Sequence, residues 1–368
     1  MRRLREFDFI RAVAALSVIA IHVTGIYVYS SRAAYAWNQA MRYAVPLFII
    51  LSGFLLAYSE VGKKNLSYSE FIQKRFKKIV IPYLIWTTIY VLFNLRGHYK
   101  EAFSDIYQFG GSFMKNILFG TGDLHLYFVI IILQMYLLYP LLKMLLARWE
   151  GATLLFSFAI TLYFQTGIYL QNIKVARILP RTWIPYYESF LPWLFFFVFG
   201  MVAVGRMEGW RERYLKGWGI SGVIWGISFL VLISDSIFTQ TNADSIKPTV
   251  MLYCMTSFFF FYTAALKLKD TSTRIGDILD WLSKQSFLIY LSHILILVLL
   301  KGAVRKIGLP GLWDGSIGMG LLFIANVVCT AIFVYVISFT PAASYLGGVP
   351  SGEANKLFGD SNKANMGA

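Results

Sequence analysis

Stretches of about 20 apolar residues recur throughout this chain of 368 residues and limit the folds open to it. A helix of about 20 residues rises ~30 Å, enough to cross the apolar core of a bilayer. Only 14% of the residues are charged, against about 25% in soluble domains. We therefore predict an all-α, polytopic integral membrane protein. About ten transmembrane helices are expected, at residues 9–28, 43–59, 79–95, 124–146, 152–170, 189–205, 217–234, 249–266, 285–300 and 315–338.

The distribution of Lys and Arg predicts the orientation of these helices. With the N-terminus in the cytoplasm, 21 of the 34 Lys and Arg residues lie in segments that face the cytoplasm and 12 in segments that face outside. Because positive residues are enriched in cytoplasmic loops, we predict an N-in, C-in arrangement. Residues 1–340 would form the transmembrane domain. Residues 341–368, rich in Gly, Ser, Asn and Lys, would form a loosely ordered cytoplasmic tail.

The first apolar segment carries two ionisable side chains. Arg11 and His22 are eleven residues apart, so on a helix both lie on one face, ~16 Å apart along the axis. Asp8 can join the same face. An ionisable group in a span is costly and normally faces protein or a water-filled cavity, so this stripe predicts a polar path through the membrane. The alternatives are that Arg11 reaches the headgroups and that His22 is a neutral, hydrogen-bonded histidine.

A basic segment precedes the third apolar segment. Residues 66–83 combine an apolar stripe with four cations, and two of these, Arg75 and Lys78, share a helix face. Arginine binds phosphate through two parallel hydrogen bonds, and lysine binds it as a point charge. The segment is therefore either a docking site for a phosphorylated cytosolic ligand or a basic anchor at anionic lipid.

The other polar positions of the apolar segments favour packing roles. His125 opens the fourth segment on the same predicted side as His22, and we expect His293 in the ninth segment to be buried and hydrogen-bonded. Nearly all Asp and Glu residues fall in loops, which argues against a carboxylate-driven ion-coupled transporter. Cys254 and Cys329 lie in apolar segments, and the sequence has no metal-ligand spacing, so no metal cofactor is expected. The net charge of +15 is explained by topology, and no pattern typical of nucleic-acid binding is present.

The chain resembles the membrane acyltransferase-3 family in five motifs that occur in order. They are Asp8-Phe9-Ile10-Arg11 with His22; Pro46, Ser52, Gly53 and Phe54 in the second segment; Arg75-Phe76-Lys77-Lys78 before Ile81-Pro82-Tyr83; His125-Leu126-Tyr127-Phe128; and Ser286 to His293. Two positions depart from the family pattern. Lys78 stands where a second arginine is usual, which loses a bidentate contact, and Tyr127 replaces a tryptophan. The chain is similar to stand-alone polysaccharide O-acyltransferases such as intercellular-adhesin C-type proteins.

The resemblance implies that an acyl group, acetyl or succinyl, moves from cytosolic acyl-CoA to a hydroxyl of a glycan or glycolipid. Acetyl-CoA is the expected donor. His22 would act as the general base, with Arg11 orienting the donor or stabilising developing negative charge. Arg75 and Lys78 would bind the phosphates of the donor.

The resemblance also implies partners and a location. His125 and Tyr127 are the residues expected to bind the acceptor, and Tyr186, Tyr187 and Glu188, between the fifth and sixth segments, are further candidates. The expected location is the bacterial plasma membrane, as a multi-pass protein surrounded by lipid and working beside polysaccharide-synthesis machinery. No nucleic-acid partner is expected.

Two other classes of protein would fit the same sequence features. An exporter or flippase for a polysaccharide or lipid-linked sugar would suit the polar path and the aromatic outer loops without any acyl chemistry. A sensor or scaffold membrane protein is the third alternative, although ionisable groups on one membrane face favour it less. Loss of His22 would distinguish the enzyme, which needs a base, from a translocator.

Overall fold

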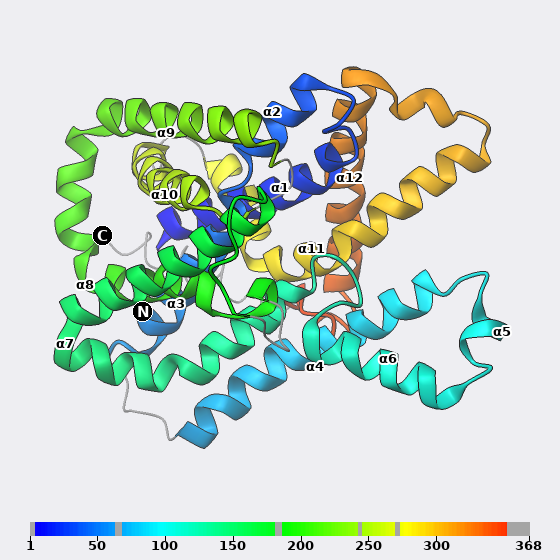
Figure 1. Ribbon diagram of the computed structural model, residues 1–368, viewed down its shortest axis with the longest axis horizontal. Coiled ribbons are helices and arrows are strands. Elements are labelled where there is room, and N and C mark those ends of the chain that lie inside the picture. Colours follow the sequence, from blue (N-terminus) through cyan, green and yellow to red (C-terminus); the bar gives the residue numbers. More distant parts are fainter. Residues whose placement is uncertain (1–3, 63–67, 181–185, 242–244, 269–272, 352–368) are drawn as a thin grey trace.

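The computed structural model describes residues 4–62, 68–180, 186–241, 245–268 and 273–351, and all regular elements in those ranges are helices (Figure 1). This confirms the predicted all-α, polytopic fold. The α-helices are α1 Arg5–Gly25, α2 Arg32–Ala40, α3 Ala44–Glu60, α4 Tyr68–Asn94, α5 Tyr99–Ala102, α6 Ile106–Phe119, α7 Tyr127–Asn172, α8 Leu194–Lys216, α9 Trp218–Thr239, α10 Pro248–Leu268, α11 Thr273–Lys306 and α12 Gly315–Ser338. Short 3₁₀ helices are η1 Tyr186–Glu188, η2 Leu191–Trp193 and η3 Pro310–Trp313.

Helix α7 contains two of the predicted membrane segments. Its 46 residues would extend about 69 Å as one rod, roughly twice the thickness of a bilayer core. The backbone at Trp149 is not helical, with φ −142° and ψ 61°, and it divides the element into two helices. Among the described residues, eight helices, α7 counted once, are long and apolar enough to cross a membrane. The count of ten crossings and the N-in, C-in orientation stay predictions.

Helix α1 lies at the centre of the bundle and contacts α2, α3, α10, α11 and α12. Several of its small and branched residues, among them Ala12, Ala14 and Val23, are fully buried. Close approach of neighbouring helices to these small side chains is typical of helix packing in membranes. The helix that carries Arg11 and His22 is therefore enclosed by protein, as the predicted polar stripe requires.

Helices α3 and α8 pack at very short range through glycines. A Cβ atom at Gly53 would lie 2.2 Å from the carbonyl oxygen of Phe197, and one at Gly200 would lie 2.0 Å from that of Ile50. Only hydrogen fits at either position, so the two backbones are in direct contact. This contact fixes α3, which forms one wall of the cavity described below.

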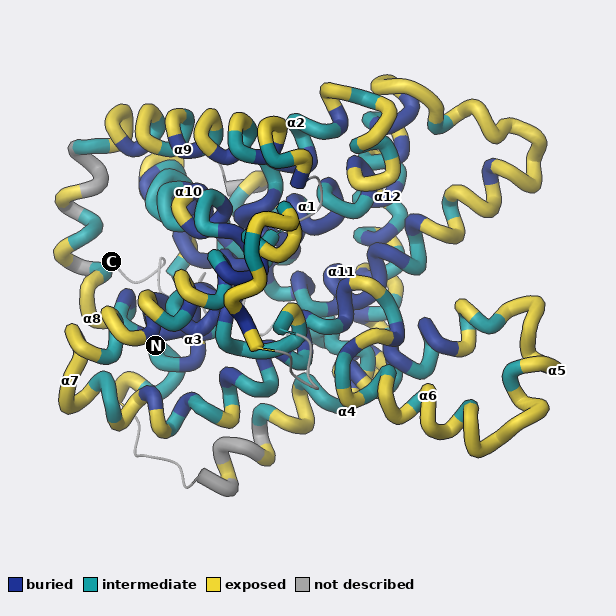
Figure 2. Tube along the Cα trace, in the orientation of Figure 1, coloured by how far each residue is buried: buried dark blue, intermediate teal, exposed yellow. Residues whose placement is uncertain are grey.

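The periphery of the molecule is apolar but exposed. Figure 2 shows long exposed faces on α9 and α12, where Ile227 of α9 is 57% and Ile324 of α12 is 58% exposed. In a polytopic protein such faces contact lipid. Helices α5 and α6 project at one end of the bundle and contain no buried residue. Residues 341–351 turn back along the bundle after α12; the rest of the predicted tail lies outside the described residues, and the division at residue 340 stays a prediction.

Candidate functional site

Three of the four histidines of the chain meet inside the helical bundle. The ring centroid of His22 lies 5.1 Å from that of His293 and 6.2 Å from that of His125, and the rings of His125 and His293 are 5.4 Å apart. They come from α1, from the turn before α7 and from α11, three segments distant in the sequence. The fourth, His98, is exposed beside Glu101. We call the group of His22, His125 and His293 the histidine cluster.

His125 is paired with a carboxylate. Its side chain is 2% exposed, and its Nδ1 lies 3.2 Å from Oδ1 of Asp123, which is 15% exposed. A carboxylate accepts, so Nδ1 carries the proton and Nε2 presents its lone pair. That Nε2 is buried and has no hydrogen-bond partner among the described residues. An imidazole held in this way can receive a proton at Nε2 while the carboxylate stabilises the resulting cation.

His293 is held in the same tautomer by backbone. Its Nδ1 lies 2.8 Å from the carbonyl oxygen of Tyr290 and 3.2 Å from that of Ile289, so Nδ1 donates. Its Nε2 is buried without a partner among the described residues. The expectation of burial is confirmed, but the side chain is only half satisfied. His22 is half-buried, and its ring forms no hydrogen bond to another described residue. The cluster thus presents several free nitrogen atoms to one small space.

A cavity of about 710 Å³ approaches the histidine cluster from one side of the bundle. Its walls come from α1, α3, α4, α7 and α11 and from the segment after α12. Four of its lining side chains are cations: Arg11, Arg75, Lys78 and Lys284. Lys78 is exposed, which marks the surface end, and Arg75 donates from Nη2 to Oγ of Ser59 at 2.9 Å. This volume is typical of a small-molecule site, and its charge suits an anionic ligand.

Tyr290 separates the inner end of the cavity from the histidine cluster. It lines the cavity, and its ring centroid lies 5.3 Å from that of His125 and 6.1 Å from that of His293. Its hydroxyl donates to the carbonyl oxygen of His125. A ligand that fills the cavity to this end therefore contacts Tyr290, whose ring packs against two of the clustered histidines.

Arg11 lines the cavity and does not belong to the histidine cluster. Asp8 lies within electrostatic range of Arg11 and accepts a hydrogen bond from Oγ of Ser283 at 2.7 Å, which ties α1 to α11. Because α1 is one continuous helix, Arg11 and His22 are ~16 Å apart along its axis. Their shared face is borne out, but a single reacting atom cannot touch both.

Tyr127, two residues after His125, lies within electrostatic range of Arg42 and Glu188. The carbonyl oxygen of Glu188 accepts from Nε2 of Gln134 at 2.8 Å, which folds η1 back onto α7. Oε2 of Glu188 has no hydrogen-bond partner among the described residues, and burial raises the pKa of this carboxyl above its ordinary value. Tyr127 and Glu188, both candidates from the sequence, thus lie close together.

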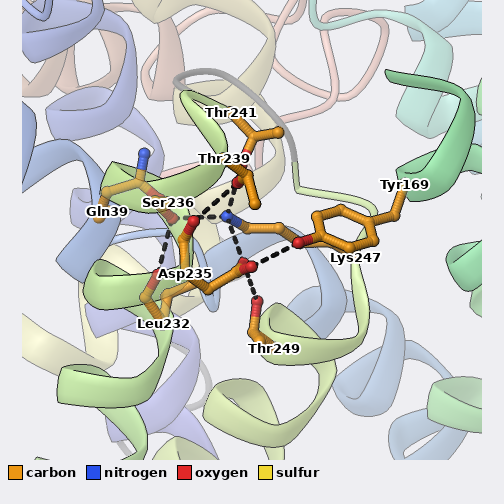
Figure 3. A network of polar contacts seen from close by, with 9 residues as sticks. All are labelled: Gln39, Tyr169, Leu232, Asp235, Ser236, Thr239, Thr241, Lys247 and Thr249. Atoms are coloured by element: carbon orange, nitrogen blue, oxygen red, sulfur yellow. Dashed lines mark hydrogen bonds and ion pairs between the residues drawn. The ribbon is translucent and has the colours of Figure 1, made fainter. Parts of the chain in front are cut away.

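A buried polar network holds the helix ends near α2 (Figure 3). Nζ of Lys247, which is fully buried, donates to Oγ of Ser236 at 2.5 Å and to Oγ1 of Thr241 at 3.0 Å, and it pairs with Oδ2 of Asp235 at 3.2 Å. Oγ of Ser236 also donates to Oε1 of Gln39 in α2 at 3.1 Å. The preceding residue, Asn38, donates from Nδ2 to the carbonyl oxygen of Ile21 at 2.9 Å, directly before His22.

The structure places the candidate residues from the sequence in two groups. Arg11, Arg75 and Lys78 line one cavity, and His22 and His125 meet in one cluster. Sequence reasoning missed Asp123, Lys284 and the role of His293. The one sequence feature that could have indicated His293 as a site residue was its position at the end of the fifth motif. Among the described residues, no three His, Cys, Asp or Glu side chains are arranged to hold a metal ion.

Comparison with known proteins shows to which family the chain is similar. The family model described as "Acyltransferase domain" matches residues 4–340. The Bacillus subtilis (strain 168) protein named "Putative membrane-bound acyltransferase YfiQ" is 25% identical over 348 residues, which cover 89% of this chain and 89% of that protein. No solved structure matches.

Proposed function

The chain belongs to this acyltransferase family, and from that premise we propose that it is a multi-pass membrane O-acyltransferase using cytosolic acyl-CoA. The acyl group is acetyl or succinyl, with acetyl-CoA as the preferred donor, and the acceptor is a hydroxyl of a glycan or glycolipid. The protein works in the bacterial plasma membrane beside the machinery that synthesises the acceptor.

The observation that carries the proposal is the cavity lined by four cations that reaches Tyr290, whose ring packs against His125 and His293 of the histidine cluster. Acyl-CoA has several phosphates at one end, a long, thin pantetheine arm and a thioester at the other end. The phosphates suit Arg75, Lys78 and Lys284. The arm suits the part of the cavity that α3 and α11 line. The thioester then lies at Tyr290, whose ring packs against His125 and His293.

The reaction needs a base at that point. As the acceptor oxygen attacks the thioester carbonyl carbon, His22 takes the hydroxyl proton. The tetrahedral intermediate collapses with cleavage of the carbon–sulfur bond, and the proton passes from His22 to the departing thiolate, which leaves as CoA. His125, with Tyr127, binds the acceptor hydroxyl. Arg11, ~16 Å away along α1, orients the donor arm and does not contact the reacting carbonyl.

The test is transfer from radiolabelled acetyl-CoA in inverted membrane vesicles, with the native acceptor present. His22→Ala is compared with His98→Ala at matched expression, since His98 is an exposed histidine outside the cluster. We expect His22→Ala to lose at least about 10²-fold in rate, the contribution of a general base, and His98→Ala to keep wild-type rates. Full activity in His22→Ala would remove His22 from the mechanism.

A further inference from the structure

The segment that follows α12 forms part of the cavity wall. We call residues 342–350 the C-terminal strap. Ser344, Gly347, Gly348, Val349 and Pro350 line the cavity together with the four cations. The strap lies beyond residue 340, where the match to the acyltransferase family ends. It is therefore a feature of this chain that the family comparison does not explain.

The strap is anchored to two helices. Gln285 of α11 is 1% exposed and holds Val349 with both ends of its amide: Val349 N donates to Oε1 at 2.9 Å, and Nε2 donates to the Val349 carbonyl oxygen at 2.7 Å. Trp86 of α4 donates from Nε1 to the carbonyl oxygen of Leu346 at 3.1 Å. Ala343 is fully buried. Buried, two-point hydrogen bonding of this kind fixes a backbone in one position.

Two glycines let the strap press against α11. Gly347 has φ +90°, and a Cβ atom there would lie 2.8 Å from Cδ1 of Phe287. A Cβ atom at Gly348 would lie 2.8 Å from Cδ2 of Leu288. A side chain at Gly347 is thus excluded both by backbone conformation and by space. Without side chains at these positions, the backbone itself faces the cavity.

The chemistry of the strap differs from that of the opposite walls. Residues 342–350 read AASYLGGVP and contain no charged side chain, whereas the cations of the cavity come from α1, α4 and α11. A wall of small residues and backbone suits an uncharged, narrow chain with amide groups. It does not suit a phosphate, which needs cations or several free N–H groups.

We propose that the C-terminal strap is the wall that seats the pantetheine arm of the donor, while Arg75 and Lys78 hold its phosphates. This rests on the proposed acyl-CoA donor. Displacing the strap then weakens binding of any donor with a pantetheine arm, whether or not that donor carries the nucleotide. Removing one of the cations weakens only the binding of the donor that carries phosphates.

The test compares two donors, acetyl-CoA and S-acetylpantetheine, with the purified full-length protein. Gly347→Ala moves the strap off Phe287, and Gln285→Ala releases Val349. The control is Gly308→Ala, a second glycine with positive φ (+79°) but no atom within 4 Å of a Cβ. We expect each strap variant to raise KM about tenfold for both donors with kcat nearly unchanged, and Gly308→Ala to match wild type. Arg75→Ala should raise KM for acetyl-CoA alone.

A labelling experiment covers the case in which a strap variant fails to fold. Ser344→Cys in a Cys329→Ser background presents one reactive thiol at the cavity, because Cys254 is buried. We expect CoA to protect this thiol from a maleimide. Unchanged KM values in both strap variants, or no protection by CoA, would overturn the role of the strap while wild-type transfer still supports the enzyme. If wild type neither binds CoA nor transfers from it, the donor proposal fails and the strap proposal falls with it.

Discussion

At the scale of single residues, the two nitrogens of His125 have different surroundings. Nδ1 lies 3.2 Å from Oδ1 of Asp123, and Nε2 is buried without a hydrogen-bond partner among the described residues. Of the three clustered histidines, His125 is the one whose ring is in hydrogen-bond contact with a carboxylate in the described structure. In the proposed mechanism it can therefore share the proton that His22 takes from the acceptor, and Asp123 would act on the reaction by fixing the tautomer of His125.

Asp123→Asn tests this positioning role. The amide can offer its NH₂ group to Nδ1 and so stabilise the other tautomer, which removes the free lone pair at Nε2. We expect kcat to fall by about 10²-fold with little change in the KM for acetyl-CoA. Steady-state kinetics at saturating acceptor measure kcat and the KM for acetyl-CoA separately. Asp123→Glu should recover part of the rate. A fall in donor affinity with unchanged kcat would assign Asp123 a structural role instead.

Residues within one helix were predictable because helical periodicity relates them. Arg11 and His22 share a face of one continuous helix, as their spacing predicted. The ionisable groups in an apolar segment indicated that this helix is enclosed by protein. The partners from other helices were not predictable, since no periodicity connects His293 with His22. Asp123 was passed over because it lies in a short turn before α7, and a carboxylate in a loop is normally solvated.

At the scale of elements, the contact of α3 with α8 depends on two glycines. Gly200→Ala would place a methyl group 2.0 Å from the carbonyl oxygen of Ile50, so the helices must separate. We expect a loss of about 1–3 kcal/mol in the free energy of unfolding, the usual cost of overpacking. Unfolding in detergent compares it with Gly205→Ala, on the same helix, where a Cβ meets no atom within 4 Å. Equal stability of the two variants would contradict the close contact.

The network around Lys247 gives a second test at this scale. Lys247→Met leaves the Asp235 carboxylate with Tyr169 and Thr249 as donors but without its cation. Removing one partner of a buried pair typically costs about 3 kcal/mol or more, and we expect a loss of that order. The double variant Lys247→Met/Asp235→Asn should recover part of it, and the exposed Lys301→Met should be neutral. Additive losses in the double variant would show that the two charges do not interact.

Long apolar elements were predictable, whereas short ones were not. Each predicted membrane segment corresponds to a helix or to one half of α7, because a run of about 20 apolar residues has few other stable states in lipid. Helices α2 and α6 were not predicted. They have 9 and 14 residues and lie between the spans, where length and hydropathy give no comparable signal.

At the scale of the whole molecule, composition was enough to predict the class of fold but not its arrangement. The low charge content and recurrent apolar segments required a helical membrane protein. Which helices surround α1 depends on side-chain shape, such as the glycines of α3 and α8, and on polar contacts between distant segments, such as Asp8 with Ser283. The cavity arises only from that arrangement, so its walls, the strap above all, lay beyond sequence reasoning.

The position of Tyr290 has a consequence for the membrane itself. The cavity is open to water on one side, and the imidazoles of the histidine cluster lie beyond it. If the two were joined, protons could leak across the bilayer and dissipate the proton gradient. The Tyr290 ring and its hydroxyl bond to the His125 backbone close that route. We expect proteoliposomes with Tyr290→Ala to lose an imposed pH difference faster than wild type, and those with Tyr290→Phe to stay nearly as tight, as a trapped pH-sensitive dye would report. A membrane acyltransferase with polar groups inside its helical bundle must also keep the bilayer impermeable to protons.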